Sequence, residues 1–89
     1  MMKKVELDKI LDIINKTEDL YVTSTQINDN LVDLGMDSIK FVQIVVSLEE
    51  EFECEIPDSK LLITEMDTVQ KIQDVLQALY EDNNGKTID

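Results

Sequence analysis

The stretch Leu34-Gly35-Met36-Asp37-Ser38-Ile39, which runs into an apolar and then acidic segment ending at Phe52, decides the fold of this 89-residue chain. Gly35 permits a tight turn. Asp37 is a good helix cap, because its carboxylate can accept free backbone N–H groups of the first turn. With Asp37 as the cap, Met36 and Phe41 occupy the two positions of a hydrophobic staple. The sequence therefore predicts a helix over 38–52 that begins at Ser38, with the serine hydroxyl facing solvent.

This position of Ser38 has two interpretations. A phosphate carried on its hydroxyl would lie beside unpaired N–H groups and the positive end of the helix dipole. A serine at a helix start is also a common structural residue with no further role. The position alone does not decide between them.

A longer match favours the first interpretation. The string 34–39, together with Val42, Val46, the run 48–52 and the segment 56–58, resembles the attachment motif of acyl and peptidyl carrier proteins. The resemblance implies an all-α, four-helix bundle with three long helices, one short third helix and a long loop between the first two. It also implies that 4′-phosphopantetheine from coenzyme A is attached covalently to Ser38, with Asp37 as the motif's helix cap, and that cargo travels as a thioester.

The same resemblance implies the partners. They are a magnesium-dependent phosphopantetheinyl transferase, an acyl- or amino-acid-activating ligase, and condensing or acyltransferase enzymes with basic docking surfaces. Ile39, Val42 and Val46 would form the apolar centre of the docking surface, with Glu50 at its acidic rim. On pattern alone this stripe is equally well explained as additional core, because a central helix can be buried on two sides. The core face itself is predicted at Phe41, Val45, Leu48 and Phe52.

Composition agrees with one small helical domain. The hydrophobic fraction is 43%, and two Gly and one Pro are too few for a sandwich or barrel with many turns. We expect a carrier domain over 1–82 and a disordered tail over 83–89.

The charge is strongly acidic. Twenty Asp and Glu face eight basic residues, giving a formal net charge of −12. Such a chain is repelled by nucleic acid and anionic membranes, so neither is expected as a partner. We also expect the protein to be a monomer. Much of the charge is explained by a solvated surface. Cys54 is the one cysteine and no secretion signal or membrane-length apolar run is present, so we expect a cytoplasmic location.

The remaining helices are predicted from the helical spacing of apolar residues and from residues that favour helix ends. A first helix is predicted over 5–16, and a short third helix over 58–65. A last helix is predicted from a Thr68 cap to Tyr80, with Gly85 as a stop. The long loop 17–36 requires apolar anchors in the core. The candidates are Leu20, Val22, Ile27, Leu31 and Leu34.

The sequence gives little support for a catalytic site or a metal site. The chain has no His, so Ser38 and Cys54 lack the usual base for nucleophilic catalysis, and one Cys without His excludes structural zinc. We therefore expect no enzyme activity and no metal site. An unmodified acidic helical adaptor and, more weakly, a small hydrolase are the competing hypotheses.

The pathway is predicted from two departures from fatty-acid carriers. The segment Leu31-Val32-Asp33-Leu34-Gly35 is one residue tighter than theirs, and Leu61-Leu62-Ile63 replaces a mostly acidic third-helix segment. The runs 49–52 and 56–58 instead resemble fatty-acid carriers. We expect a free-standing carrier in a specialised pathway of the polyketide or nonribosomal peptide kind, with fatty-acid synthesis as the alternative.

Overall fold

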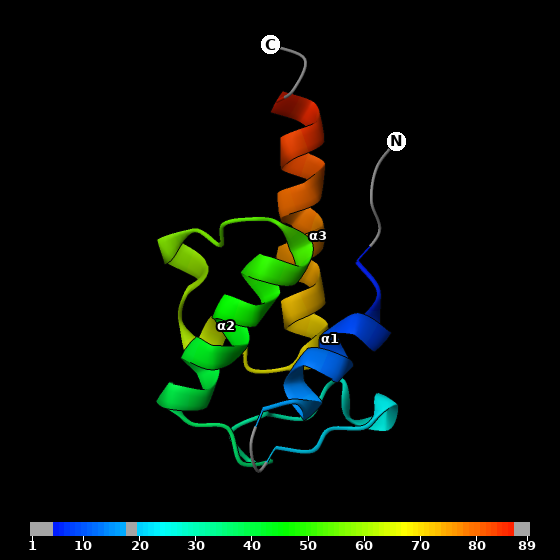
Figure 1. The fold of residues 1–89 in the computed structure, drawn as a ribbon, viewed down its shortest axis with the longest axis vertical. Helices are drawn as coiled ribbons and strands as arrows, with labels where there is room; N and C mark the ends of the chain where they lie inside the picture. The colour runs from blue at the N-terminus through cyan, green and yellow to red at the C-terminus, as the bar shows by residue number, and fades with distance from the viewer. Residues whose placement is uncertain (1–4, 18–19, 87–89) are drawn as a thin grey trace.

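The described part of the chain is entirely helical. The computed structural model describes residues 5–17 and 20–86 (Figure 1). No strand occurs within these residues, which confirms the predicted all-α class. The elements are the helices α1 (Leu7–Asn15), α2 (Ser38–Phe52) and α3 (Val69–Lys86), and the 3₁₀ turns η1 (Ser24–Gln26), η2 (Asp58–Lys60) and η3 (Ile63–Glu65).

Helix α2 has the predicted boundaries. The Asp37 carboxylate accepts the backbone N–H of Lys40 at 2.8 Å, so it caps the helix. The helix ends where Glu53 adopts a left-handed conformation, with φ 51° and ψ 52°. The four predicted core residues of this helix are all buried, as is Ile44. The Asp37 cap, which is a local signal, therefore decided where this helix begins.

One apolar core joins the three helices. Helix α1 lies against both α2 and α3, and the C-terminal half of α3 projects beyond the other two helices (Figure 1). α1 contributes Ile10 and Ile14, and α3 contributes Ile72 and Leu76. The first helix is shorter than predicted, beginning at Leu7 rather than residue 5. None of the described helices is long and apolar enough to cross a membrane.

The loop between α1 and α2 is anchored as predicted. Leu20, Val22 and Leu31 are buried, while Ile27 and Leu34 are partly buried against the core. The Asn15 side chain accepts the Val22 N–H at 2.7 Å and donates to the Val22 carbonyl at 2.9 Å. These contacts fix the start of the loop to the end of α1.

The prediction of a continuous short helix over 58–65 is wrong in its detail, because η2 and η3 are separated by an extended Leu62 (φ −119°, ψ 138°). Leu61 and Ile63 are both partly buried against the core, whereas Leu62 is 55% exposed. Residues at i and i+2 face the same side only when the backbone between them is extended. Burial of this apolar pair therefore interrupts the helix.

Helix α3 is longer than predicted. It continues to Lys86, so the predicted end at Tyr80 and the predicted stop at Gly85 are wrong. A glycine inside a helix costs about 1 kcal/mol relative to alanine and does not forbid it. Helical backbone thus enters the predicted tail over 83–89, and residues 87–89 lie outside the described part. The domain boundary at residue 82 stays a prediction.

Candidate functional site

A tight turn brings the chain to the start of α2. The Asn30 side chain accepts the Val32 N–H at 2.8 Å, and the Val32 carbonyl accepts the Gly35 N–H at 3.1 Å. Gly35 has φ 119°, a value that favours glycine. The Met36 N–H then donates to the Leu31 carbonyl at 2.9 Å, which closes the turn. Met36 and Phe41 are both buried, as expected for a staple across the helix start.

Ser38 is the first residue of α2 and is exposed. The Phe41 N–H donates to the Asp37 carbonyl at 2.8 Å, whereas the N–H groups of Ser38 and Ile39 have no hydrogen-bond acceptor among the described residues. Two free N–H groups at the positive end of a helix favour an anion there. A phosphate ester on the serine hydroxyl therefore fits the residues that surround it.

Lys40 adds a positive charge at this helix start, which sequence reasoning missed. Its Nζ lies 3.9 Å from Oδ2 of Asp37, and its side chain is 22% exposed. The ammonium group offsets part of the Asp37 charge that would otherwise repel a phosphate on Ser38. The i, i+3 spacing of an acidic and a basic residue was the available signal.

An exposed apolar stripe descends from Ser38 along α2. Ile39 is 71% exposed, Val42 58% and Val46 47%, and Glu50 is also exposed. Their spacings of three, four and four residues place all of them on one face of the helix. The pattern had left core and surface equally open for this stripe, and the structure places it on the surface.

The far end of α2 carries no comparable chemistry. Partial burial raises the pKa of the Cys54 thiol above its ordinary value of 9.0, and the nearby Glu49 carboxylate raises it further. The thiol is therefore a poor nucleophile at neutral pH. Among the described residues, no three or more His, Cys, Asp or Glu side chains come together as a metal site.

Comparison with known proteins shows which family this sequence resembles. The family model described as "Phosphopantetheine attachment site" matches residues 8–78. The acyl carrier protein of Cyanidioschyzon merolae (strain NIES-3377 / 10D) is 38% identical to this chain over 79 residues, and the match covers 85% of this chain and 82% of that protein. The chain belongs to the acyl carrier protein family.

Membership of the acyl carrier protein family decides between the earlier hypotheses. The cofactor is 4′-phosphopantetheine, held covalently, and an acyl carrier protein carries substrates without catalysing reactions. Family membership therefore favours the carrier hypothesis over the two competing hypotheses, the unmodified adaptor and the small hydrolase. A phosphopantetheinyl transferase and biosynthetic enzymes are its partners as a class. The expected cytoplasmic location, monomeric state and lack of nucleic acid or membrane partners stay predictions.

Sequence reasoning also missed contacts between this carrier's distant segments. The Leu31 N–H donates to the Asp67 carbonyl at 2.7 Å, and the Gln70 N–H donates to the Ile27 carbonyl at 2.9 Å. Both bonds tie the loop before Ser38 to the start of α3. No local pattern signals them, because each pair is about forty residues apart.

Proposed function

We propose that Ser38 carries the phosphopantetheine arm of this acyl carrier protein. The supporting observation is the exposed hydroxyl at the first position of α2, beside the two free N–H groups of Ser38 and Ile39. When bound, the arm supplies a thiol on which acyl groups travel as thioesters. The chain's own part is to present the serine hydroxyl to the transferase.

Attachment requires a base that this chain does not supply. The serine oxygen forms a bond to the phosphorus of coenzyme A that bears the pantetheine, the phosphoanhydride bond breaks, and the adenosine bisphosphate leaves. The serine proton must go to a base. Asp37 uses Oδ1 to accept the Lys40 N–H, and the sequence contains no His. We assign the base to the transferase and a capping role to Asp37.

The docking surface consists of Ile39, Val42 and Val46, with Glu50 at its edge. The three apolar side chains are exposed in line with Ser38, so a partner that covers them also approaches the serine. The net charge of −12 favours partners with basic surfaces, which it steers toward the carrier.

We further propose that the carrier serves a specialised pathway, with an amino acid or short acyl group as cargo. The segment 61–63 supports this proposal. Within it Leu62 has an extended backbone and is 55% exposed, so this leucine forms an apolar edge where the fatty-acid pattern has acidic residues. A dedicated ligase could recognise such an edge.

Intact-mass measurement tests the attachment site. The unmodified protein is incubated with coenzyme A, Mg²⁺ and a broad-specificity transferase, and should gain one arm. Ser38→Ala should gain none. Ser47→Ala is the matched control, because Ser47 is an exposed serine on the same helix, and it should gain one arm like the parent. An arm mapped to Ser47 or Ser59 would contradict the proposal.

A further inference from the structure

The loop that leads to Ser38 is held from the start of α3. Leu31 is fully buried, and its N–H donates to the Asp67 carbonyl at 2.7 Å. The Leu31 carbonyl in turn accepts the Met36 N–H at 2.9 Å. Met36 is followed directly by the Asp37 cap and Ser38. Two short backbone hydrogen bonds therefore connect Asp67, through Leu31, to the turn from Gly35 to Ser38.

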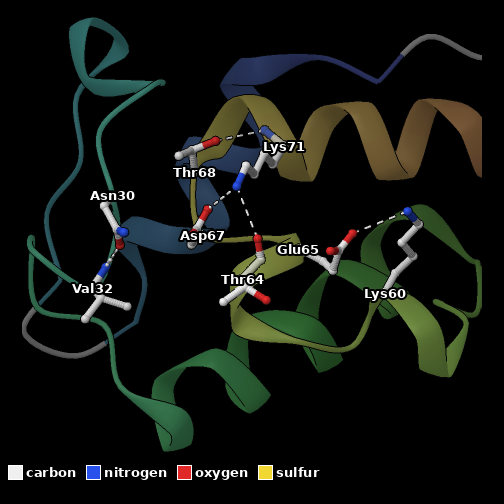
Figure 2. Close-up of polar contacts among 8 residues, drawn as sticks. All are labelled: Asn30, Val32, Lys60, Thr64, Glu65, Asp67, Thr68 and Lys71. Atoms are coloured by element: carbon white, nitrogen blue, oxygen red, sulfur yellow. Dashed lines mark hydrogen bonds and ion pairs between the residues drawn. The ribbon is translucent and has the colours of Figure 1, made fainter.

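Lys71 fixes Asp67 in place. Its Nζ lies 2.9 Å from Oδ1 of Asp67 and donates to the Thr64 carbonyl at 3.1 Å (Figure 2). Its backbone N–H donates to the Thr68 hydroxyl at 3.0 Å, so the first turn of α3 is also capped. One lysine therefore connects η3, Asp67 and α3.

Asp67 depends on this lysine. Its side chain is only 16% exposed, and its buried Oδ1 accepts no hydrogen bond from the described residues, which leaves the Lys71 ion pair as its charge partner. An unpaired buried carboxylate is costly, so loss of the Lys71 charge should move Asp67 toward water. The backbone carbonyl that accepts the Leu31 N–H also belongs to Asp67, so movement of Asp67 would disturb this hydrogen bond.

We propose that Lys71 is a positioning residue for the attachment reaction. Through Asp67 and Leu31 it holds the turn from Gly35 to Ser38 in the conformation that the transferase binds. The proposal rests on Ser38 being the attachment site. Without the lysine charge, fewer molecules have the binding conformation, so KM rises in inverse proportion to that fraction while kcat stays the same.

Lys60 provides a matched control. It also pairs with a carboxylate of this segment, Glu65, at 3.4 Å, and both lysine side chains are about half exposed (Figure 2). Lys60→Met and Lys71→Met remove the same charge. Among the described residues, however, Glu65 makes no backbone hydrogen bond to the loop before Ser38.

The experiment compares amide hydrogen exchange and transferase kinetics in the full, unmodified chain. Lys71→Met should speed exchange of the Leu31 and Met36 amides about two- to fivefold, the range expected for a partly exposed ion pair. KM for the carrier should rise by a similar factor, with kcat unchanged. Lys71→Arg should restore both values, and Lys60→Met should alter neither.

The Val22 amide is the internal reference, because it donates to Asn15 at the other end of the loop. Faster exchange at Val22 as well would indicate general destabilisation and overturn the positioning role. Unchanged exchange at Leu31 in Lys71→Met would also overturn it. If the parent protein gains its arm at a serine other than Ser38, the proposed function fails, and the positioning role fails with it whatever the exchange rates are.

Discussion

The hydroxyl of Tyr80 donates a 2.8 Å hydrogen bond to the backbone carbonyl of Phe52, the last residue of α2. The two rings also meet edge to face, with centroids 6.3 Å apart. The last carbonyls of a helix have no intrahelical donor, so this bond satisfies one of them. Tyr80 thereby fixes the C-terminal end of α2 to α3, at the opposite end of the helix from Ser38.

Tyr80→Phe should lower the free energy of unfolding by about 1 kcal/mol, since it removes one hydrogen bond and keeps the ring contact. Urea unfolding measures this change. Tyr21→Phe is the control, because Tyr21 is exposed and its substitution should change stability by less than about 0.5 kcal/mol. Equal effects of the two substitutions would show that the Tyr80 hydroxyl contributes nothing.

Asp37→Ala should destabilise the protein by about 1 kcal/mol through loss of the helix cap. Asp37→Ser should cost less, because a serine hydroxyl can also accept the Lys40 N–H. Urea unfolding separates the two variants. If Asp37→Ser is as unstable as Asp37→Ala, the carboxylate stabilises the helix by its charge rather than by the capping bond.

The Asp37 cap also shows why the sequence predicted α2 so well. The signal at the start of α2 is local, namely the cap at Asp37, and the face of each apolar residue follows from spacing. The segment after Pro57 differs, because tertiary burial of both Leu61 and Ile63 overrides helical spacing there. Spacing also left the exposure of Ile39, Val42 and Val46 undecided. It shows that these residues share one face of the helix, but not whether another segment packs on that face.

The contacts between the loop before Ser38 and the start of α3 could not be predicted from local sequence patterns either, because a local pattern does not say which distant segment a residue meets. The bond from Leu31 to Asp67 joins backbone atoms of segments that approach each other only in the folded chain. The family resemblance predicted Ser38 as the attachment site, but it did not indicate the proposed role of Lys71 in positioning the turn before it.

The docking surface is tested by two adjacent valines. Val46→Asp should leave the fold intact and weaken partner binding at any salt concentration, because Val46 is exposed and its apolar contact would be lost. Val45→Asp should unfold the protein, because Val45 is buried. Circular dichroism reports the fold, and titration with the transferase reports binding. Unfolding of Val46→Asp would contradict the surface assignment.

Glu50→Lys should affect the same surface differently. Because Glu50 is exposed at the edge of the stripe, its charge reversal should mainly slow association with a basic partner and reduce the dependence of the rate on salt. Stopped-flow binding at several ionic strengths measures both effects. A dissociation rate that rises as much as the association rate falls would place Glu50 within the apolar contact instead.

The pathway prediction depends on the edge that contains Leu62. In the fatty-acid pattern this segment is mostly acidic, so an enzyme of that pathway should meet charge where this chain presents an exposed leucine. We expect the phosphopantetheinylated protein to be loaded by an adenylating ligase with an amino acid or short acyl group, and to be a poor substrate for malonyl transferase and the condensing enzymes of fatty-acid synthesis. Leu62→Glu should weaken loading by the ligase while leaving the transferase reaction at Ser38 unchanged, because the surface that we propose for the transferase is the α2 stripe, which does not include Leu62. Mass spectrometry of the loaded arm measures each reaction. Efficient elongation to long acyl chains would contradict the specialised pathway and support the fatty-acid alternative.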